Sequence, residues 1–163
     1  MVKNCITENI HGLSDVNWAA IAFDVATEEQ IKLLWPLMMK ETNFWHGDMP
    51  TQLVSKPFNY REWEFREPLS FKRTVGPLYD VAAMGRVWFL ESMACIKMGE
   101  IKRLKDSVLK VCRMGKRHGW FWYERYHPLQ TGDVYPSGPH GYCEYPAILV
   151  RIVLGNPDIF GTK

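Results

Sequence analysis

Residues 78–117 read LYDVAAMGRVWFLESMACIKMGEIKRLKDSVLKVCRMGKR, and this stretch decides the predicted fold class. Leu78–Met98 is apolar on most helical faces, which is typical of a helix that is buried on all sides. Gly99 follows, and glycine is the residue that most often ends a helix. Glu100–Arg117 is apolar along one side and charged along the other. The stretch therefore predicts a helical hairpin, in which a buried helix is followed directly by an amphipathic one.

The same order of helices occurs on the N-terminal side of this hairpin. Ser14–Ala26 is apolar on nearly every side, and Thr27–Lys40 follows at once with one apolar face. Thr27 and Gln30 form a capping-box pattern, and Pro36 is expected to kink or shorten the second helix. On the C-terminal side, a last short apolar segment precedes Gly155. We therefore predict an all-α fold whose helical hairpins form an inner and an outer ring.

The connections between these helices alternate in length. The connections that lead from a buried helix to an amphipathic helix contain almost no residues. The connections that lead from an amphipathic helix to a buried one, Glu41–Pro77 and His118–Tyr145, are long. Long connections within a compact domain are usually functional. Because both of them enter a buried helix, we expect them to cover the same face of a single domain, residues 1–163.

The composition excludes several classes of protein. The 163 residues are 47% hydrophobic and 23% charged with a net charge of +2, which is typical of globular proteins. No block of like charge occurs, so we expect no nucleic-acid partner. No apolar run is as long as a membrane span, so we expect no membrane partner. The compartment stays open: cytoplasmic if Met1 is the natural start, and periplasmic or secreted if the start is truncated.

Both long connections are rich in aromatic rings, carboxylates and arginines. The first contains Arg61 and Trp63, and the second contains Trp120, Trp122 and Tyr126. Aromatic rings stack on the apolar face of a sugar, and charged groups bind its hydroxyls. These connections therefore favour carbohydrate as the partner. The alternative is that the rings pack on the helix ends as part of the core.

The sequence predicts neither a metal site nor a cofactor. The five histidines show no i,i+4 pair, and no Cys-x-x-Cys motif occurs. A glycine-rich phosphate loop and a nucleophile elbow are also absent from the sequence.

Residues 121–131, FWYERYHPLQT, and 138–154, GPHGYCEYPAILVRIVL, resemble the end of glycosidases built on an (α/α)6 toroid. Mannosylglycerate hydrolase, processing α-glucosidase and trehalase are enzymes of this kind. Residues 73–99 are similar to the inner helix and turn of their preceding hairpin. The resemblance implies that this chain is the C-terminal half of such a toroid, and part of an inverting glycoside hydrolase.

The resemblance also implies roles for particular residues. The glutamate that matches the general base of these enzymes is Glu124, although it could instead be a structural carboxylate paired with Arg125 or His127. Glu144 is the second candidate, and it could equally be a charge that faces a helix dipole. The general acid of these enzymes is an aspartate in the first half of the toroid, and no segment here matches its motif. The residues expected to contact the sugar are Trp63, Trp120, Trp122, Tyr126, Arg61, Arg125 and Glu144.

Two other functions remain open at this point. The chain could be a non-catalytic all-α module that binds a glycan or a protein, or a toroid polysaccharide lyase with Tyr126 or His127 as its base. As half of a ring, it would be inactive alone and would pair with a missing N-terminal half or with a second copy. That contact would cover the flanks of the buried helices, at Trp18, Ile21, Val87, Trp88 and Phe89.

Overall fold

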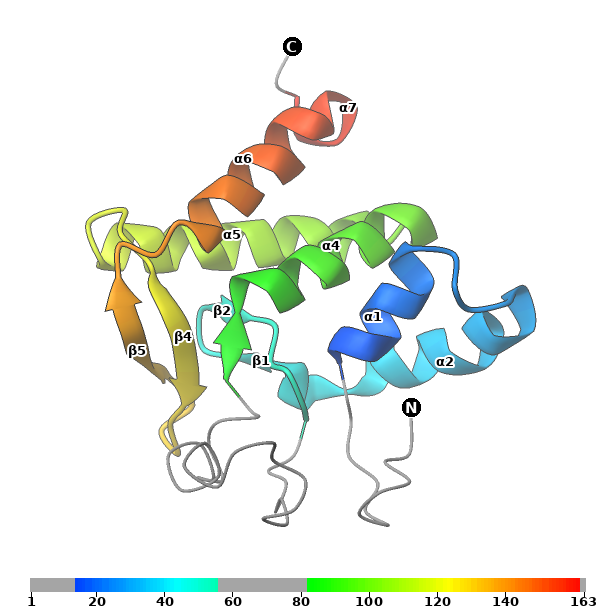
Figure 1. The fold of residues 1–163 in the computed structure, drawn as a ribbon, viewed down its shortest axis with the longest axis horizontal. Coiled ribbons are helices and arrows are strands. Elements are labelled where there is room, and N and C mark those ends of the chain that lie inside the picture. Colours follow the sequence, from blue (N-terminus) through cyan, green and yellow to red (C-terminus); the bar gives the residue numbers. More distant parts are fainter. Residues whose placement is uncertain (1–13, 56–81, 162–163) are drawn as a thin grey trace, which may run out of the picture.

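The computed structural model describes residues 14–55 and 82–161, and this part of the chain combines helices with two small antiparallel sheets (Figure 1). It is 58% helical, and the sheets have two and three strands. The fold is therefore mixed α/β, and the prediction of an all-α toroid half is wrong. Most of these strands form in the two long connections of the predicted toroid, and one forms at Ala83–Met84, within the predicted buried helix.

The first half of the described chain contains two helices and a short hairpin. Its elements are α1 (Asp15–Ala22), α2 (Glu28–Lys40), the 3-10 turn η1 (Thr42–Phe44), β1 (Trp45–His46) and β2 (Met49–Pro50). The second half contains the longer helices and the larger sheet. Its elements are β3 (Ala83–Met84), α4 (Gly85–Met98), α5 (Ile101–Arg117), β4 (Tyr123–Pro128), β5 (Val134–His140), α6 (Glu144–Gly155) and α7 (Pro157–Phe160).

The helices follow the signals in the sequence closely. The capping box is confirmed, because the Thr27 side chain accepts from Gln30 N and the Gln30 side chain accepts from Thr27 N. Gly99 ends α4 with φ +69°, a conformation that costs glycine little. α5 then buries one side, including Leu104 and Val111, and exposes its lysines and arginines. Local capping and periodicity are therefore sufficient to define α2, α5 and the end of α4. The start of α4 at Gly85 and the end of α1 at Ala22 differ from the predicted bounds, Leu78 and Ala26.

The three-stranded sheet, in the order β3-β4-β5, is the main departure from the prediction. Ala83 and Met84 were expected to be helical, but they pair with Tyr126 and Arg125 of β4. β4 and β5 form a hairpin whose turn includes Gly132 at φ +85°. β1 and β2 form a second hairpin, whose turn includes Gly47 at φ +50°. The strands of these two hairpins therefore belong to segments that are rich in aromatic residues and interrupted by glycine.

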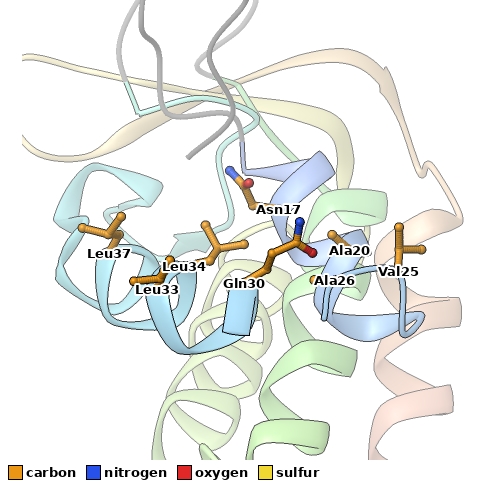
Figure 2. A pocket seen from close by; sticks show the side chains of 8 residues that line it. All are labelled: Asn17, Ala20, Val25, Ala26, Gln30, Leu33, Leu34 and Leu37. Carbon is orange, nitrogen blue, oxygen red and sulfur yellow. The ribbon is translucent and has the colours of Figure 1, made fainter. Parts of the chain in front are cut away.

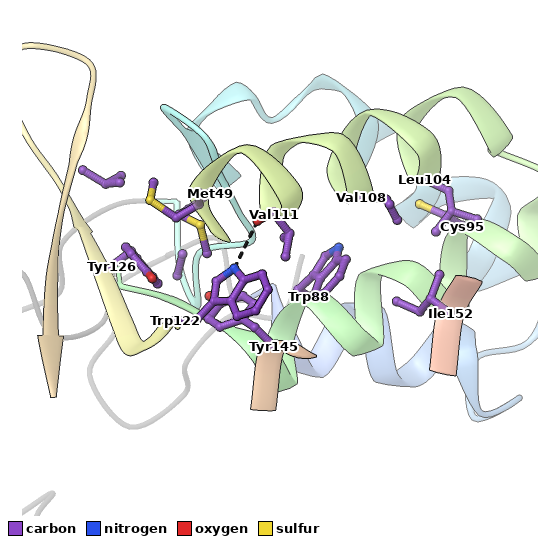
Figure 3. Packing of buried hydrophobic residues seen from close by; sticks show 13 residues of the cluster. Met49, Trp88, Cys95, Leu104, Val108, Val111, Trp122, Tyr126, Tyr145 and Ile152 are labelled. Carbon is purple, nitrogen blue, oxygen red and sulfur yellow. Dashed lines mark hydrogen bonds between the residues drawn. The ribbon is translucent and has the colours of Figure 1, made fainter. Parts of the chain in front are cut away.

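Trp88 of α4 lies in the larger of two hydrophobic clusters, where α4, α5, α6 and β4 meet (Figure 3). Its ring stacks on Tyr145 at 6.0 Å, and its Nε1 donates to Ser107 Oγ at 2.9 Å. The smaller cluster lies between α1, α2 and α4 and centres on Trp18.

The apolar flanks that the half-ring prediction left exposed are covered in this fold. Trp18, Ile21, Val87 and Trp88 are buried, and Phe89 is partly buried beneath the Arg151 guanidinium at 5.2 Å. The exposed apolar residues of the structure are different ones.

Candidate functional site

Four chain segments meet at one end of the three-stranded sheet. β4 begins there at Tyr123, opposite His140 at the end of β5. The chain then turns into α6, and Tyr142 N donates to Trp122 O at 2.9 Å across this turn. α4 also begins here, directly after β3. Figure 1 shows this end of the sheet beside the start of α6 and the C-terminal end of α5. We call this region the sheet end.

Glu124 occupies the sheet end on β4 and is largely buried. Its Oε1 accepts from Arg125 Nη2 at 2.9 Å, so the alternative in which Glu124 pairs with Arg125 is part of the observed geometry. Its other oxygen lies over Gly138 of β5. A Cβ added to Gly138 would be 2.7 Å from Glu124 Oε2, which is closer than Cβ atoms come to other atoms. Glycine at position 138 therefore leaves the space that this carboxylate fills.

Glu144 has a similar arrangement at the start of α6. A Cβ added to Gly85, the first residue of α4, would lie 3.0 Å from Glu144 Oε2. Met84, the N-cap of α4, provides no side-chain hydrogen bond to this helix. Glu144 Oε2 is shielded from solvent and has no hydrogen-bond partner among residues 14–55 and 82–161. Glu144 thus lies at the N-terminus of α4 as well as at the N-terminus of its own helix, α6.

The strand register relates the two glutamates to the same end of the three-stranded sheet. Met84 and Arg125 are the last residues of β3 and β4 to pair. Gly85, the first residue of α4, follows Met84, and Glu124 precedes Arg125, so the start of α4 and Glu124 lie at the same end of the sheet. Because Glu144 packs on Gly85, both of the glutamates predicted from the sequence belong to the sheet end.

Exposed rings lie on one side of the sheet end. Trp120 and Phe121 are 57% and 59% exposed, although both precede a buried residue, Trp122. Next to them, Tyr123 stacks on His140 with ring centroids 4.4 Å apart. Trp120 is thus an accessible ring, and Phe121 is a second accessible ring that the sequence did not single out.

His118 adds a titratable group to these rings, since it lies edge-on to Tyr123 at 5.4 Å. Burial, together with the positive charge of Arg117 and the neighbouring His140, holds the pKa of His118 below 6.5. The side chain is therefore neutral at a pH where an ordinary histidine begins to be protonated.

Two rings that were expected to line sugar subsites belong to the core instead. Trp122 is buried and its Nε1 donates to Val111 O at 3.0 Å (Figure 3). Tyr126 is also buried, and its hydroxyl accepts from Tyr123 N at 2.9 Å. No face of either ring is available to a ligand in this conformation. Trp63 and Arg61 lie outside the described residues.

The surroundings of Tyr126 and His127 count against the lyase alternative, in which one of these side chains is the base. Burial raises the pKa of Tyr126 to about 12, which makes its hydroxyl a poor proton acceptor or donor near neutral pH. His127 has Nε2 2.7 Å from Ser137 Oγ and stacks on Tyr135. Both side chains hold the hairpin together, and neither is a favourable base.

Glu91 of α4 forms a second polar cluster, in the interior of the molecule. It is buried, pairs with Arg103 of α5, and accepts from Trp45 Nε1 at 2.9 Å. Burial raises its pKa, and the Arg103 charge and the Trp45 hydrogen bond oppose that shift. The Arg103 guanidinium also lies over the Trp45 ring at 4.4 Å. A polar residue on a buried helix is compatible with a central cavity or with a salt bridge to a neighbouring helix, and here the salt bridge is present.

A third group of charges ties both hairpin turns to α5. Asp48 in the β1–β2 turn pairs with Arg113 and Arg117, and Asp133 before β5 pairs with Arg117. The Val134 N–H and Arg117 lower the pKa of Asp133. Such a carboxylate is poorly suited to donate a proton, so Asp133 is not a suitable general acid.

Three further findings concern metal ligands, membrane spans and known proteins. Within residues 14–55 and 82–161, no group of three or more His, Cys, Asp or Glu side chains is placed to hold a metal ion. None of the helices in these ranges is both long enough and apolar enough to cross a membrane. The sequence matches no protein-family model and no curated protein.

Proposed function

We propose that this chain is a carbohydrate-active protein, and that it binds and hydrolyses a glycoside at the sheet end with Glu124 as general base. The observation that supports the proposal is the placement of two glutamates at the sheet end, each packed over a glycine: Glu124 over Gly138 and Glu144 over Gly85. Glycoside hydrolysis requires two carboxyl groups that flank the scissile bond.

The surroundings of the two glutamates suit a sugar. Arg125 and the carboxylates offer donors and acceptors to hydroxyl groups, and they are fixed on a strand and a helix. Trp120 and Phe121 provide exposed rings for the apolar face of a pyranose. A sugar bound here would contact groups from α4, β4, β5 and α6 together.

The proposed reaction assigns one role to each carboxyl group. Glu124 takes a proton from the attacking water, while Arg125 holds its Oε1 and so fixes the orientation of the carboxylate. Glu144 is the second carboxyl group, which protonates the oxygen of the leaving group. For an inverting reaction, the two groups stand roughly 6.5–9.5 Å apart so that a water fits between the sugar and the base.

The experiment is a screen of the purified full chain against unactivated disaccharides and oligosaccharides, with detection of new reducing ends. Glu124→Gln should bind the selected sugar as well as the natural sequence does but lose at least about a hundredfold in turnover. Glu28→Gln, at an exposed glutamate in α2, is the matched control and should retain full turnover. Unchanged turnover in Glu124→Gln would exclude Glu124 as the base.

Glycan binding without catalysis is the second candidate, and one observation favours it. Glu124 already binds Arg125 through one oxygen, as carboxylates in binding sites often do. This candidate predicts saturable sugar binding with no product, and a loss of affinity in Glu124→Gln. The hydrolase predicts the opposite for both measurements.

A further inference from the structure

The apolar groove between α1 and α2 lies apart from the sheet end (Figure 2). Its volume is about 430 Å³, and the described residues that line it are uncharged, mostly alanine, valine and leucine. Many apolar surfaces can cover such a groove, whereas a buried polar atom requires a partner of matching chemistry. The polar atoms inside the sheet end are therefore the more specific feature of the structure.

Two consecutive residues of α6 each have a buried polar atom without a hydrogen-bond partner. These atoms are Glu144 Oε2 and Tyr145 Oη, and neither has a partner in the described parts of the chain. Tyr145 is fully buried, whereas Glu144 is partly exposed, so Oε2 is the inner oxygen of the Glu144 carboxyl group. Buried polar atoms in folded proteins nearly always form hydrogen bonds, either with protein groups or with ordered water.

The packing of α6 on α4 brings these two side chains to the same face of α4. Glu144 packs on Gly85. The Tyr145 ring stacks on Trp88 with centroids 6.0 Å apart, and it meets the Tyr126 ring edge-on at 5.8 Å (Figure 3). Gly85 and Trp88 are three residues apart, so they lie on one side of the helix. Both side chains therefore lie between α6 and the first turn of α4.

The charges around the Tyr145 hydroxyl indicate that the Glu144 carboxyl group is near it. Burial raises the pKa of Tyr145 well above 10, the neighbouring Tyr126 and Glu144 raise it further, and the positive charge of Arg86 lowers it. The hydroxyl therefore keeps its proton at neutral pH and can donate a hydrogen bond. Within the described structure no direct hydrogen bond joins this donor to Glu144. A donor and an acceptor in this relation are commonly bridged by a water molecule.

The first turn of α4 supplies further donors at the same place. The N–H groups of a first helical turn have no acceptor within their own helix, and the side chain of Met84, the N-cap residue, offers none. A buried water molecule typically forms about three hydrogen bonds. The Tyr145 hydroxyl, the inner oxygen of Glu144 and one N–H group of this turn provide that number.

We propose that Tyr145 is a positioning residue for Glu144, and that the two side chains bind one ordered water molecule between α6 and the start of α4. The water accepts a hydrogen bond from the Tyr145 hydroxyl and donates one to Glu144 Oε2. The inner oxygen is thereby fixed and the outer oxygen faces the sugar, in the same way that Arg125 fixes one oxygen of Glu124. The role in catalysis rests on the proposed function, whereas the shared water molecule does not.

The shared water molecule is tested by a double-mutant cycle in urea unfolding of the full chain, which requires no sugar. Tyr145→Phe keeps the ring and removes only the hydroxyl, so it should reduce the folding equilibrium constant by about fivefold. In a Glu144→Ala background the same change should reduce it by less than about twofold, because the water has already lost one partner. The control is Tyr135→Phe, at an exposed tyrosine of β5, which should change the constant little in either background.

Two results of this cycle would overturn the shared water molecule. If Tyr145→Phe leaves the folding equilibrium constant unchanged or raises it, the hydroxyl has no partner in the folded chain, since a buried hydroxyl without a hydrogen bond is unfavourable. If Tyr145→Phe has the same effect in both backgrounds, the hydroxyl and Glu144 do not share a partner.

Kinetics on the sugar selected in the screen test the positioning role. Tyr145→Phe should lower kcat by at least about tenfold and leave KM within about twofold, because Tyr145 is buried and does not touch the sugar. An unchanged kcat would overturn the positioning role even where Glu124→Gln abolishes turnover. A coupled cycle in a chain that hydrolyses no sugar would support the shared water molecule and exclude the positioning role together with the proposed function.

Discussion

The carboxylate of Glu124 fills the space that a side chain at position 138 would occupy. A Cβ on Gly138 would be 2.7 Å from Glu124 Oε2 and 2.9 Å from Glu124 Cβ. Gly138 also has φ +79°, so an L side chain there is strained as well as crowded. Contact and strain can be separated, because Gly132 has φ +85° with no atom within 4 Å of an added Cβ.

We predict that Gly138→Ala displaces the Glu124 carboxylate, whereas Gly132→Ala does not. Both variants should lose about 1–2 kcal/mol of unfolding free energy from backbone strain. Gly138→Ala should lose more than Gly132→Ala in urea unfolding, and it alone should reduce sugar binding or turnover. Equal effects of the two substitutions on both measurements would mean that Gly138 does not position Glu124.

Trp122 and Trp120 should respond differently to replacement by alanine. Trp122 is buried against Gly115, where an added Cβ would be 2.2 Å from the indole, and it belongs to the larger core cluster. Trp122→Ala should therefore lower the free energy of unfolding by about 3–5 kcal/mol. Trp120→Ala, at an exposed ring, should lower it by less than about 1 kcal/mol and should instead weaken sugar binding. Calorimetric unfolding and a binding titration of both variants test this, and a mild effect of Trp122→Ala would contradict its place in the core.

Removing only one member of the Glu91–Arg103 pair should lower the free energy of unfolding much more than removing both. Removing Arg103 leaves a buried carboxylate without its counter-charge, so Arg103→Met should lower the unfolding free energy by about 3–5 kcal/mol. The double variant with Glu91→Leu should lose much less than the two single variants together, because no buried charge remains. Asp106→Asn breaks an exposed pair with Lys102 and should change stability little. Additive losses in the double variant would show that the two side chains do not depend on each other.

His118 should make stability depend on pH in a narrow range. Its pKa in the folded chain lies below 6.5, so the unfolded chain takes up a proton first as the pH falls. The contribution of His118 to the free energy of unfolding is therefore complete above pH 6.5. It is lost as the pH falls from there towards the pKa of His118 in the folded chain. His118→Gln should reduce this slope in urea unfolding between neutral and mildly acidic pH and leave the slope above neutrality unchanged. If the slope between neutral and mildly acidic pH is unchanged in His118→Gln, groups other than His118 cause this pH dependence.

The sequence was most informative where structure depends on neighbouring residues. The Thr27–Gln30 capping box, the helix end at Gly99 and the one-sided apolar pattern of α5 are local features, and all three were predicted. The strands depend on distant partners. Ala83 and Met84 are apolar residues next to a helix, and they form a strand because β4, about forty residues later, pairs with them.

The candidate site shows the same difference between local and distant information. Trp120, Trp122 and Tyr126 were identified, but which rings face the core depends on the register of β4 and on its irregular pairing between Tyr123 and Arg125. That register buries Trp122 and Tyr126 and leaves Trp120 exposed. The contact of Glu144 with Gly85 joins residues far apart in the chain, so no sequence pattern could show that Glu144 and Glu124 lie at the same end of the sheet.

The proposed sugar site is best tested by finding where a sugar binds on the chain. The measurement is an NMR titration of the 15N-labelled full chain with the oligosaccharide selected in the screen. Binding at the sheet end should produce saturable shifts of the backbone amides of Gly85, Trp120, Glu124 and Gly138, and these shifts should be lost in a Glu124→Ala variant. Shifts confined to other parts of the chain, or no shifts with any sugar of the screen, would contradict binding at the sheet end.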